Sequence, residues 1–205
     1  MQRLTSRLGA AAGIWTLVVI AGLLFLCDYH TRPGRVGTPA VRWPVGSRIR
    51  PDADRATLVM VAHPLCPCTA ASVEELARIM AQGKDQVSAY VLAYTPQPAP
   101  PGWEQRDLRG RIATIPGVCF LEDIDGREAT LFEGLTSGQV SLYDRDGRLR
   151  FLGGITPARG HEGHNDGQDA VVALISGGRP DRTTTPIFGC PLFDDDPAPR
   201  RGHAR

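Results

Sequence analysis

Residues 57–69 read TLVMVAHPLCPCT, and in this stretch a short apolar run leads directly into a pair of cysteines. The run at residues 57–62 is typical of a strand that is buried on both faces. An apolar helical period follows, carried by Val73, Leu76, Ala77 and Met80, and Gly83 marks its end. The stretch therefore predicts a strand, a turn that bears two cysteines, and a helix.

The elements that follow alternate in the same way. A second strand is predicted at residues 87–94, and the strand–helix–strand order makes this pair parallel. An Asp-Gly turn separates residues 139–143 from residues 148–152 and predicts an antiparallel hairpin. Further short elements are expected as helices at residues 103–112, 127–133 and 169–176 and as a strand at residues 118–121. Together they predict an α/β domain at residues 55–178, a three-layer sandwich with a mixed sheet and flanking helices.

Residues 8–27 carry no charged side chain. A helix of this length spans about 30 Å, which is the thickness of the hydrocarbon layer of a membrane. Arg3 and Arg7 precede it, so residues 1–7 are expected in the cytoplasm and the remaining chain outside it. The sequence predicts a single-pass anchor in the inner (cytoplasmic) membrane, with the domain in the periplasm or outside. A cleaved signal peptide is the alternative.

Two segments outside the domain are rich in proline, glycine and charge. Residues 28–54 show no sustained period, and Trp43 and Val45 stand as isolated apolar residues, so a linker is expected there. Residues 179–205 read as a tail that ends in a solvated stretch with Asp194–Asp196, Arg200 and Arg201. An apolar island at residues 188–192 predicts that part of this tail docks on the domain.

The composition is that of a globular protein, with 42% hydrophobic residues and a formal net charge of +1. A nucleic-acid binder needs a concentrated basic face. The near balance of charges therefore argues against nucleic acid as a partner.

Cys66, Pro67 and Cys68 lie where the first strand gives way to the first helix. Sites gather at the carboxyl ends of parallel strands, and the amino end of a helix stabilises a thiolate. A thiolate is both the nucleophile of disulfide exchange and a ligand for soft metals. We expect the two thiols to face solvent, with Pro67 stiffening the turn between them.

Four other residues are candidates for accessory roles. His63, three positions before Cys66, is expected to orient the site or to act as a ligand, although a structural turn residue is an equal alternative. Arg159 is placed to stabilise a thiolate, and His161 follows in the same glycine-rich loop, which also suits a solvated loop. Cys190 is either a third thiol near Cys66 and Cys68, a disulfide partner of Cys119, or a docked cysteine without a role.

At these residues the chain resembles the thioredoxin-like superfamily over about residues 57–177. The motifs CPCT at 66–69, TSGQVSLYD at 136–144, GGIT at 153–156 and RGH at 159–161 resemble its membrane-tethered RedB-type branch. The resemblance implies thiol–disulfide exchange, with Cys66 attacking and Cys68 resolving. Two features depart from the superfamily: the cysteines stand as CxC instead of CxxC, and Thr136-Ser137-Gly138 replaces the cis-proline that thioredoxins place opposite the disulfide.

Three functions follow from these residues. The first is a membrane-anchored thiol–disulfide oxidoreductase without a cofactor, whose partner is an unidentified extracytoplasmic thiol or disulfide protein. The second is a protein that handles copper(I) or another metal through Cys66, Cys68, His63 and His161. The third is a binding domain that keeps only the thioredoxin-like fold.

Overall fold

A computed structural model describes residues 2–101, 103 and 106–193, and the chain divides into two compact units, residues 1–32 and 33–205. The first unit is the helix α1 (Gln2–Thr31). Its part Ala11–Thr31 is long and apolar enough to cross a membrane, with a mean hydropathy of 2.1. A signal sequence near the N-terminus passes the same test. The helix continues beyond the apolar run that ends at Cys27.

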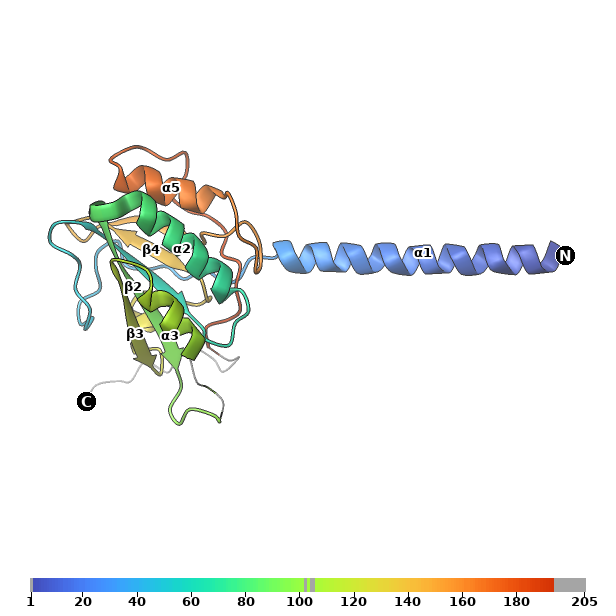
Figure 1. Ribbon diagram of the computed structural model, residues 1–205, viewed down its shortest axis with the longest axis horizontal. Helices are drawn as coiled ribbons and strands as arrows, with labels where there is room; N and C mark the ends of the chain where they lie inside the picture. The colour runs from blue at the N-terminus through green and yellow to red at the C-terminus, as the bar shows by residue number, and fades with distance from the viewer. Residues whose placement is uncertain (1, 102, 104–105, 194–205) are drawn as a thin grey trace. The chain divides into compact units, whose positions relative to one another are not determined.

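The second unit is built on one sheet of five strands in the order β3-β2-β1-β4-β5. The strands are β1 (Ala56–Ala62), β2 (Val87–Thr95), β3 (Val118–Ile124), β4 (Val140–Tyr143) and β5 (Leu149–Gly153). The first three are parallel to one another, whereas β4 pairs antiparallel with both β1 and β5 (Figure 1). This confirms the mixed sheet, its parallel crossover and the terminal hairpin.

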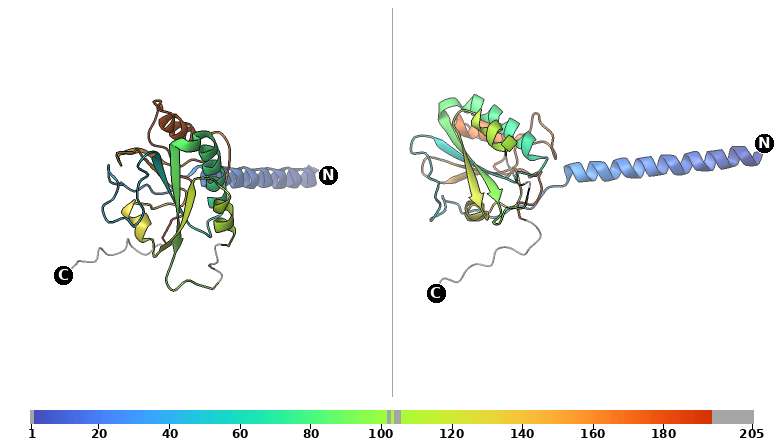
Figure 2. Two further views of the ribbon diagram at one scale, coloured as in Figure 1. Left: turned by 60° about the vertical axis from the view of Figure 1, so that its left-hand side comes forward. Right: turned by 60° about the horizontal axis from the view of Figure 1, so that its bottom comes forward.

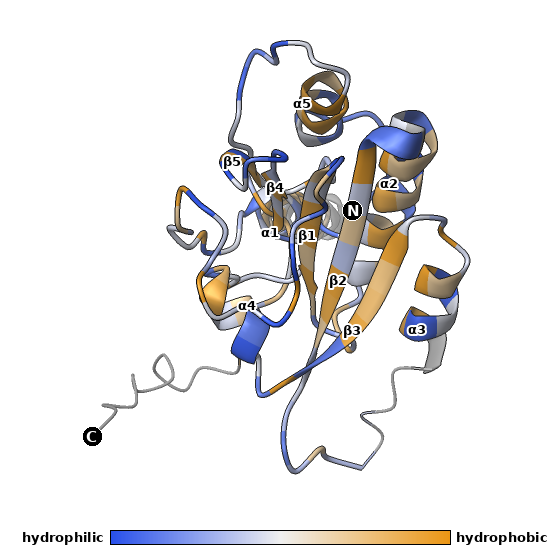
Figure 3. Ribbon diagram, turned by 90° about the vertical axis from the view of Figure 1, so that its left-hand side faces the viewer, coloured by the Kyte–Doolittle hydropathy of each residue, from blue (hydrophilic) through white to orange (hydrophobic). Residues whose placement is uncertain are grey.

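Helices cover the two faces of the sheet unequally. The helices are α2 (Thr69–Gly83), the 3-10 turn η1 (Lys84–Gln86), α3 (Arg106–Ala113), α4 (Arg127–Leu131) and α5 (Asp166–Ile175). α2, α3 and α5 lie on one face and α4 on the other (Figures 2 and 3). Successive side chains of a strand point to opposite faces, so Leu58 and Met60 of β1 pack with α2, whereas Val59 and Val61 pack on the α4 side. The three-layer α/β sandwich is thereby confirmed.

α5 begins earlier than its apolar period, at Asp166 instead of Asp169. The side chain of Asn165 caps it by accepting a hydrogen bond from the backbone N–H of Gln168 at 2.9 Å. Asp166 and Asp169 both lie in the first turn, where carboxylates are favourable. The cap and the acidic turn, not the apolar stripe, therefore set the start of this helix.

Residues 33–54, which we call the N-terminal strap, do not form the expected linker. The ring of Trp43 packs edge-on against Phe132 and Tyr143, with ring centroids 5.1 Å apart in each pair. Ile49 is buried in the same core, and Leu149 donates its backbone N–H to Val41 at 2.8 Å. The apolar residues of the strap are buried one at a time without a period, and for that reason the sequence pattern suggested a spacer.

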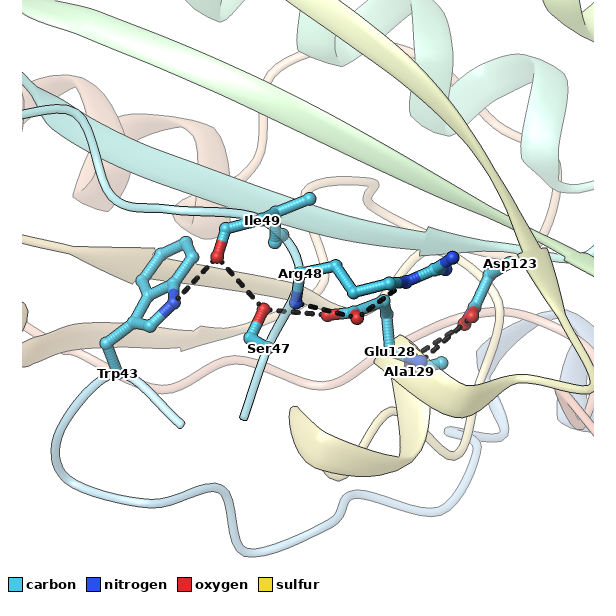
Figure 4. A network of polar contacts seen from close by, with 7 residues as sticks. All are labelled: Trp43, Ser47, Arg48, Ile49, Asp123, Glu128 and Ala129. Carbon is cyan, nitrogen blue, oxygen red and sulfur yellow. Dashed lines mark hydrogen bonds and ion pairs between the residues drawn. The ribbon is translucent and has the colours of Figure 1, made fainter. Parts of the chain in front are cut away.

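A polar network ties the N-terminal strap to α4 (Figure 4). The buried carboxylate of Glu128 accepts hydrogen bonds from the hydroxyl of Ser47 at 2.7 Å and the backbone N–H of Arg48 at 2.9 Å. Asp123 in turn accepts the backbone N–H groups of Glu128 and Ala129, at 2.9 and 2.7 Å. Burial raises the pKa of Asp123, although these two hydrogen bonds act in the opposite direction.

Residues 179–193, the described part of the tail, form the C-terminal strap. The strap follows β5, where Leu152 donates to the carbonyl of Thr183 at 3.0 Å and accepts from Thr185 at 3.3 Å. Its side chains Ile187 and Leu192 are completely buried. The apolar island of the tail is thus packed on the domain. Residues 194–205, including the acidic run and the last arginines, lie outside the described residues.

Candidate functional site

The two cysteines sit in the tight turn that joins β1 to α2. Cys66 donates its backbone N–H to the carbonyl of His63 at 3.0 Å, and Thr69 donates to the carbonyl of Cys66 at 3.1 Å. Ser72 donates to the carbonyl of Cys68 at 3.3 Å, so Cys68 stands directly at the amino end of α2. The backbone N–H of Cys68 also points to the sulfur of Cys66. The helix terminus therefore faces the first thiol.

A second turn, residues 136–138, is bound to the cysteine turn by hydroxyl groups. Ser137 Oγ accepts the backbone N–H of His63 at 2.9 Å and lies 3.0 Å from Thr69 Oγ1. Thr69 Oγ1 donates to the carbonyl of His63 at 2.9 Å. At this position the thioredoxin resemblance leads one to expect a cis-proline. Here a serine hydroxyl connects the two turns instead.

The C-terminal strap brings Cys190 to Cys66. The backbone N–H of Cys190 donates to Cys66 Sγ at 3.4 Å, and the carbonyl of Cys190 accepts from Ser137 N–H at 2.9 Å. Pro191 forms an antiparallel bridge with Thr136, so the strap lies beside the second turn as a very short strand. Of the alternatives for Cys190, the structure has the third thiol beside Cys66.

Cys119 lies elsewhere in the domain. It is exposed on β3, at the edge of the sheet, where it is paired in register with Tyr90 of β2. All five cysteines are free thiols in the structure. Because Cys190 contacts Cys66, the arrangement does not support a bond between Cys119 and Cys190.

Arg159 joins the site from the loop that follows β5. Its guanidinium donates to the carbonyl of Gly189 at 2.6 Å, directly before Cys190 in the strap. Its positive charge favours the thiolate forms of Cys68 and Cys190 and so acts to lower the pKa of each. The arginine expected near the cysteine motif therefore acts on these two thiols and holds the strap in place.

The three thiols differ in their acidity. Burial disfavours a thiolate at Cys66, but hydrogen bonds from the thiol and backbone N–H of Cys190, the N–H of Cys68 and Thr69 outweigh it. The pKa of Cys66 consequently lies below the ordinary cysteine value. Burial raises the pKa of Cys68, and the neighbouring Cys66 raises it further. Burial and the hydrogen bond to Cys66 raise the pKa of Cys190 to about 12. Cys66 is thus the thiol that ionises first.

The expectation that both thiols face solvent is wrong, because both cysteines are buried. Cys66 is 5% exposed and Cys68 is 6% exposed. The strap covers part of Cys66, and a groove of about 230 Å³ reaches it from another side. The groove is lined by residues of the cysteine turn and of helices α2 and α3: Pro64, Leu65, Cys66, Pro67, Thr69, Ala70, Leu108 and Arg111. A route from solvent to the sulfur of Cys66 therefore exists.

The two candidate histidines do not turn toward the thiols. The ring of His63 packs against Trp103 and Tyr94, at centroid distances of 5.1 and 5.8 Å, and its Nδ1 accepts from the backbone of Leu65. His161 is exposed and its Nδ1 lies 2.7 Å from the carbonyl of Arg159. Among the described residues, no group of three or more His, Cys, Asp or Glu is arranged to hold a metal ion.

Glu75, which was not among the candidates, holds a loop beside the site. It is completely buried on α2, it pairs with Arg78, and it accepts the backbone N–H of Gly163 at 2.6 Å. It thereby holds the loop that carries Arg159 against α2. Its other oxygen, Oε2, has no hydrogen-bond partner among the described atoms. The seven-residue spacing from Cys68 puts both side chains on one helical face, which is the signal that could have identified it.

Comparisons with known proteins agree at the level of the fold. No protein-family model and no curated protein matches the chain. A hypothetical protein from Sinorhizobium meliloti is 22% identical, with a TM-score of 0.56, 80% of this chain covered and 96% of the other. An uncharacterized conserved protein from Geobacillus kaustophilus is 16% identical, with a TM-score of 0.57 and coverages of 80% and 94%. A secreted disulfide oxidoreductase from Mycobacterium tuberculosis is 14% identical, with a TM-score of 0.43 and coverages of 60% and 82%.

The topology agrees with these matches. Three parallel strands followed by an antiparallel hairpin, with the cysteine turn between β1 and α2, are the features on which the sequence resemblance was based. The RedB-type branch stays a prediction. By its sheet order and its structural relatives, the domain has the thioredoxin-like fold.

Proposed function

We propose that this protein is a membrane-anchored thiol–disulfide oxidoreductase that acts outside the cytoplasm, with Cys66 as the attacking thiol and Cys68 as the resolving thiol. One observation carries the proposal: a thiol of lowered pKa stands beside a thiol of raised pKa at the amino end of α2. The thiolate is the form that attacks a disulfide. Because Cys66 ionises before Cys68, Cys66 supplies the nucleophile and Cys68 remains available as the second thiol.

The exchange uses only these two groups. The Cys66 thiolate attacks one sulfur of a partner disulfide, so that a mixed disulfide forms and the partner's other sulfur leaves as a thiolate. Cys68 then gives up its proton and attacks the sulfur of Cys66. The partner leaves with both sulfurs reduced, and the domain keeps a Cys66–Cys68 disulfide. The same steps in reverse oxidise a partner dithiol.

The groove beside Cys66 favours an extended partner over a small thiol. It is lined by apolar side chains on both sides of the cysteine, including Leu65, which is 57% exposed, and Leu108 of α3. Arg111 adds one cation to its rim. A peptide segment with an apolar residue next to its cysteine suits this surface.

The location rests on the first unit of the chain. Arg3 and Arg7 precede the apolar stretch, and residues 1–27 contain no acidic residue. Positive residues next to such a stretch stay on the cytoplasmic side of a membrane. This orientation supports the proposal that the thioredoxin-like domain lies outside the cytoplasm, in the periplasm of a bacterium with two membranes. A disulfide made there persists, whereas the cytosol would reduce it.

The test is disulfide reduction by the full chain in detergent, with insulin as substrate and a dithiol as reductant. Cys66→Ser is expected to abolish the activity. The double variant Cys68→Ser/Cys190→Ser, which keeps no second thiol beside Cys66, is expected to accumulate a mixed disulfide with the substrate. Cys119→Ser is the matched control, because that thiol is exposed and far from the site along the sheet. Full activity of Cys66→Ser would contradict the proposal.

The reduction potential of the Cys66/Cys68 pair separates an exchanging disulfide from a structural one. A structural disulfide has a potential below about −300 mV, so a value above this supports exchange. A lower value favours a thioredoxin-like binding domain without catalysis.

Copper(I) handling is the second candidate. Two soft thiols two residues apart favour it, because thiolates are the ligands that copper(I) prefers. The test is metal analysis of the reduced full chain under anaerobic conditions after incubation with copper(I). A stoichiometric ion that is lost in Cys66→Ser would support this function, and its absence would reject it.

A further inference from the structure

Cys190 has no part in the two-thiol exchange, yet it contacts the nucleophile directly. Its backbone N–H lies 3.4 Å from Cys66 Sγ, and the two thiol groups are hydrogen-bonded to each other. The two residues are 124 positions apart in the sequence. Such a contact is absent for Cys119, which is exposed on β3. The strap thus places one particular thiol on Cys66.

We propose that Cys190 is a third exchanging thiol, which forms an intramolecular disulfide with Cys66 and so locks the C-terminal strap over the site. The proposal deepens the proposed function, since it takes the Cys66–Cys68 disulfide from that cycle as its starting point. It assigns Cys66 to two alternative disulfides, a short one within the turn and a long one to the strap.

The strap is built to hold Cys190 at this place. Ser137 donates to the carbonyl of Cys190, and Arg159 donates to the carbonyl of Gly189 at 2.6 Å. These bonds hold the carbonyl groups directly before and directly after the Cα atom of Cys190. A Cβ atom added to Gly189 would meet the carbonyl oxygen of Ser137 at 1.9 Å. Only glycine lets the strap approach so closely, and Cys190 reaches Cys66 because of that approach.

The geometry of a disulfide is compatible with this contact. Bridged cysteines have Cα atoms about 4.4–6.8 Å apart. The backbone nitrogen of Cys190 already lies within 3.4 Å of Cys66 Sγ. The two thiols are also hydrogen-bonded to each other, so the contact that the proposed disulfide requires already exists.

The exchange needs no external oxidant once the short disulfide exists. Cys190 loses its proton and its thiolate attacks the sulfur of Cys66. The Cys66–Cys190 bond forms as the Cys66–Cys68 bond breaks, and the electron pair leaves on Cys68, which takes up the proton. Electrons and protons balance within the domain. Arg159 assists at both ends, because its charge stabilises the thiolate on Cys190 and then on Cys68.

The long disulfide would control access to the site. The strap pairs with residues 135–137 and covers one side of Cys66. In the state with Cys66 and Cys190 joined, Cys66 has no free thiol and the strap cannot leave. Reduction by a second thiol protein restores the nucleophile and frees the strap. The redox state of the compartment thereby determines whether the strap is held over Cys66 or is free to leave it.

The experiment traps the long disulfide in Cys68→Ser, where the short one cannot form. The full chain in detergent is treated with diamide, and its disulfides are mapped by mass spectrometry of peptides under non-reducing conditions. A Cys66–Cys190 peptide is expected in about tenfold excess over any disulfide that contains Cys119, because only the former pair is held in contact. A free Cys66, or equal bonding to Cys119, would overturn the proposal.

Gly189→Ala in the Cys68→Ser background provides a second measurement. This variant keeps the cysteines of its parent but pushes the strap away from Ser137, so the yield of the Cys66–Cys190 peptide is expected to fall severalfold. An unchanged yield would refute the role given to the strap. Neither measurement uses substrate turnover. A chain that forms the long disulfide but does not reduce insulin contradicts only the proposed function, and the opposite result contradicts only this inference.

Discussion

Two segments without regular structure pack on the same domain, but one of them contacts the core and the other contacts the cysteine turn. The N-terminal strap, residues 33–54, inserts Trp43 and Ile49 into the core on the α4 side and satisfies the buried carboxylate of Glu128. The C-terminal strap, residues 179–193, also buries apolar residues, but its backbone contacts the reactive cysteine turn. The two straps meet where Gly34 donates to the carbonyl of Ile187 at 2.8 Å.

The partners of the polar groups distinguish a structural segment from a functional one. In the N-terminal strap these groups bond to the carboxylate of Glu128 on α4, on the opposite face of the sheet from α2. In the C-terminal strap they bond to Cys66, to Ser137 of the second turn and to the guanidinium of Arg159. We therefore expect changes in the first strap to alter stability and changes in the second to alter thiol chemistry.

The largest expected effect is on stability and comes from Trp43→Ala. The indole packs against Phe132 and Tyr143 and donates to the carbonyl of Ile49, so its loss leaves a cavity and removes one of the two hydrogen bonds to that carbonyl. We expect a cost of about 3 kcal/mol in the free energy of unfolding, measured by urea titration of the full chain in detergent. Val45→Ala is the control in the same strap, since Val45 is 98% exposed and should change stability by less than about 0.5 kcal/mol. Equal effects of the two variants would mean that this segment is a linker after all.

The next effect in size concerns the carboxylate that the N-terminal strap satisfies. Glu128→Ala removes the acceptor for the hydroxyl of Ser47 and the N–H of Arg48. Hydrogen bonds to a charged group contribute about 1.5–3 kcal/mol, so we expect a loss of about 2 kcal/mol with insulin reduction unchanged below the transition. Asp181→Ala, at an exposed carboxylate of the C-terminal strap, is the control. A loss of reductase activity in folded Glu128→Ala would break the contrast between the straps.

The regular elements could be predicted because their signal is local. The apolar run of β1 and the period of α2 each lie within one short stretch, and the Asp-Gly turn identified the hairpin. The cysteine turn could be placed for the same reason, because it joins two such elements. Helix α5 was expected a few residues late, since its start depends on the cap by Asn165 and not on apolar spacing.

The N-terminal strap could not be predicted, and the C-terminal strap and the site only in part, because their contacts join distant residues one at a time. Trp43 meets Phe132, and Cys66 meets Cys190 over 124 positions, without any repeated spacing in the sequence. The residue types still carried information. An isolated tryptophan in the first strap and a cysteine within an apolar island of the second were the two signs that these segments pack on the domain.

A smaller effect is expected on the acidity of Cys66. The thiol of Cys190 donates to Cys66 and helps to lower its pKa against the effect of burial. Cys190→Val keeps a small apolar side chain but removes the donor, so the pKa of Cys66 should rise. Cys190→Ser keeps a donor and should leave it nearly unchanged. The measurement is the rate of alkylation by iodoacetamide as a function of pH, in a background without the other thiols outside the site. A midpoint that does not move in Cys190→Val would show that the strap has no influence on the nucleophile.

The smallest expected effect is a pH dependence of the free energy of unfolding. It comes from Asp123, which belongs to the polar network beside the N-terminal strap. Burial raises the pKa of Asp123, so the folded state binds a proton more tightly than the unfolded state does. The stability from this group is therefore fully present below the ordinary pKa of about 3.9 and is lost as pH rises through the raised value. Asp123→Asn cannot titrate.

We thus expect the free energy of unfolding of Asp123→Asn, relative to the original chain, to improve as pH rises across this window. Urea titrations at several pH values between acid and neutral measure it. The matched control is Asp125→Asn, because Asp125 is an exposed carboxylate directly after the same strand. A difference between Asp123→Asn and the original chain that stays constant with pH would mean that the backbone N–H groups of Glu128 and Ala129 fully offset burial. The carboxylate of Asp123 would then have no effect on the pH dependence of the free energy of unfolding. The two straps would in that case differ in their titrating groups through the thiols beside the C-terminal strap.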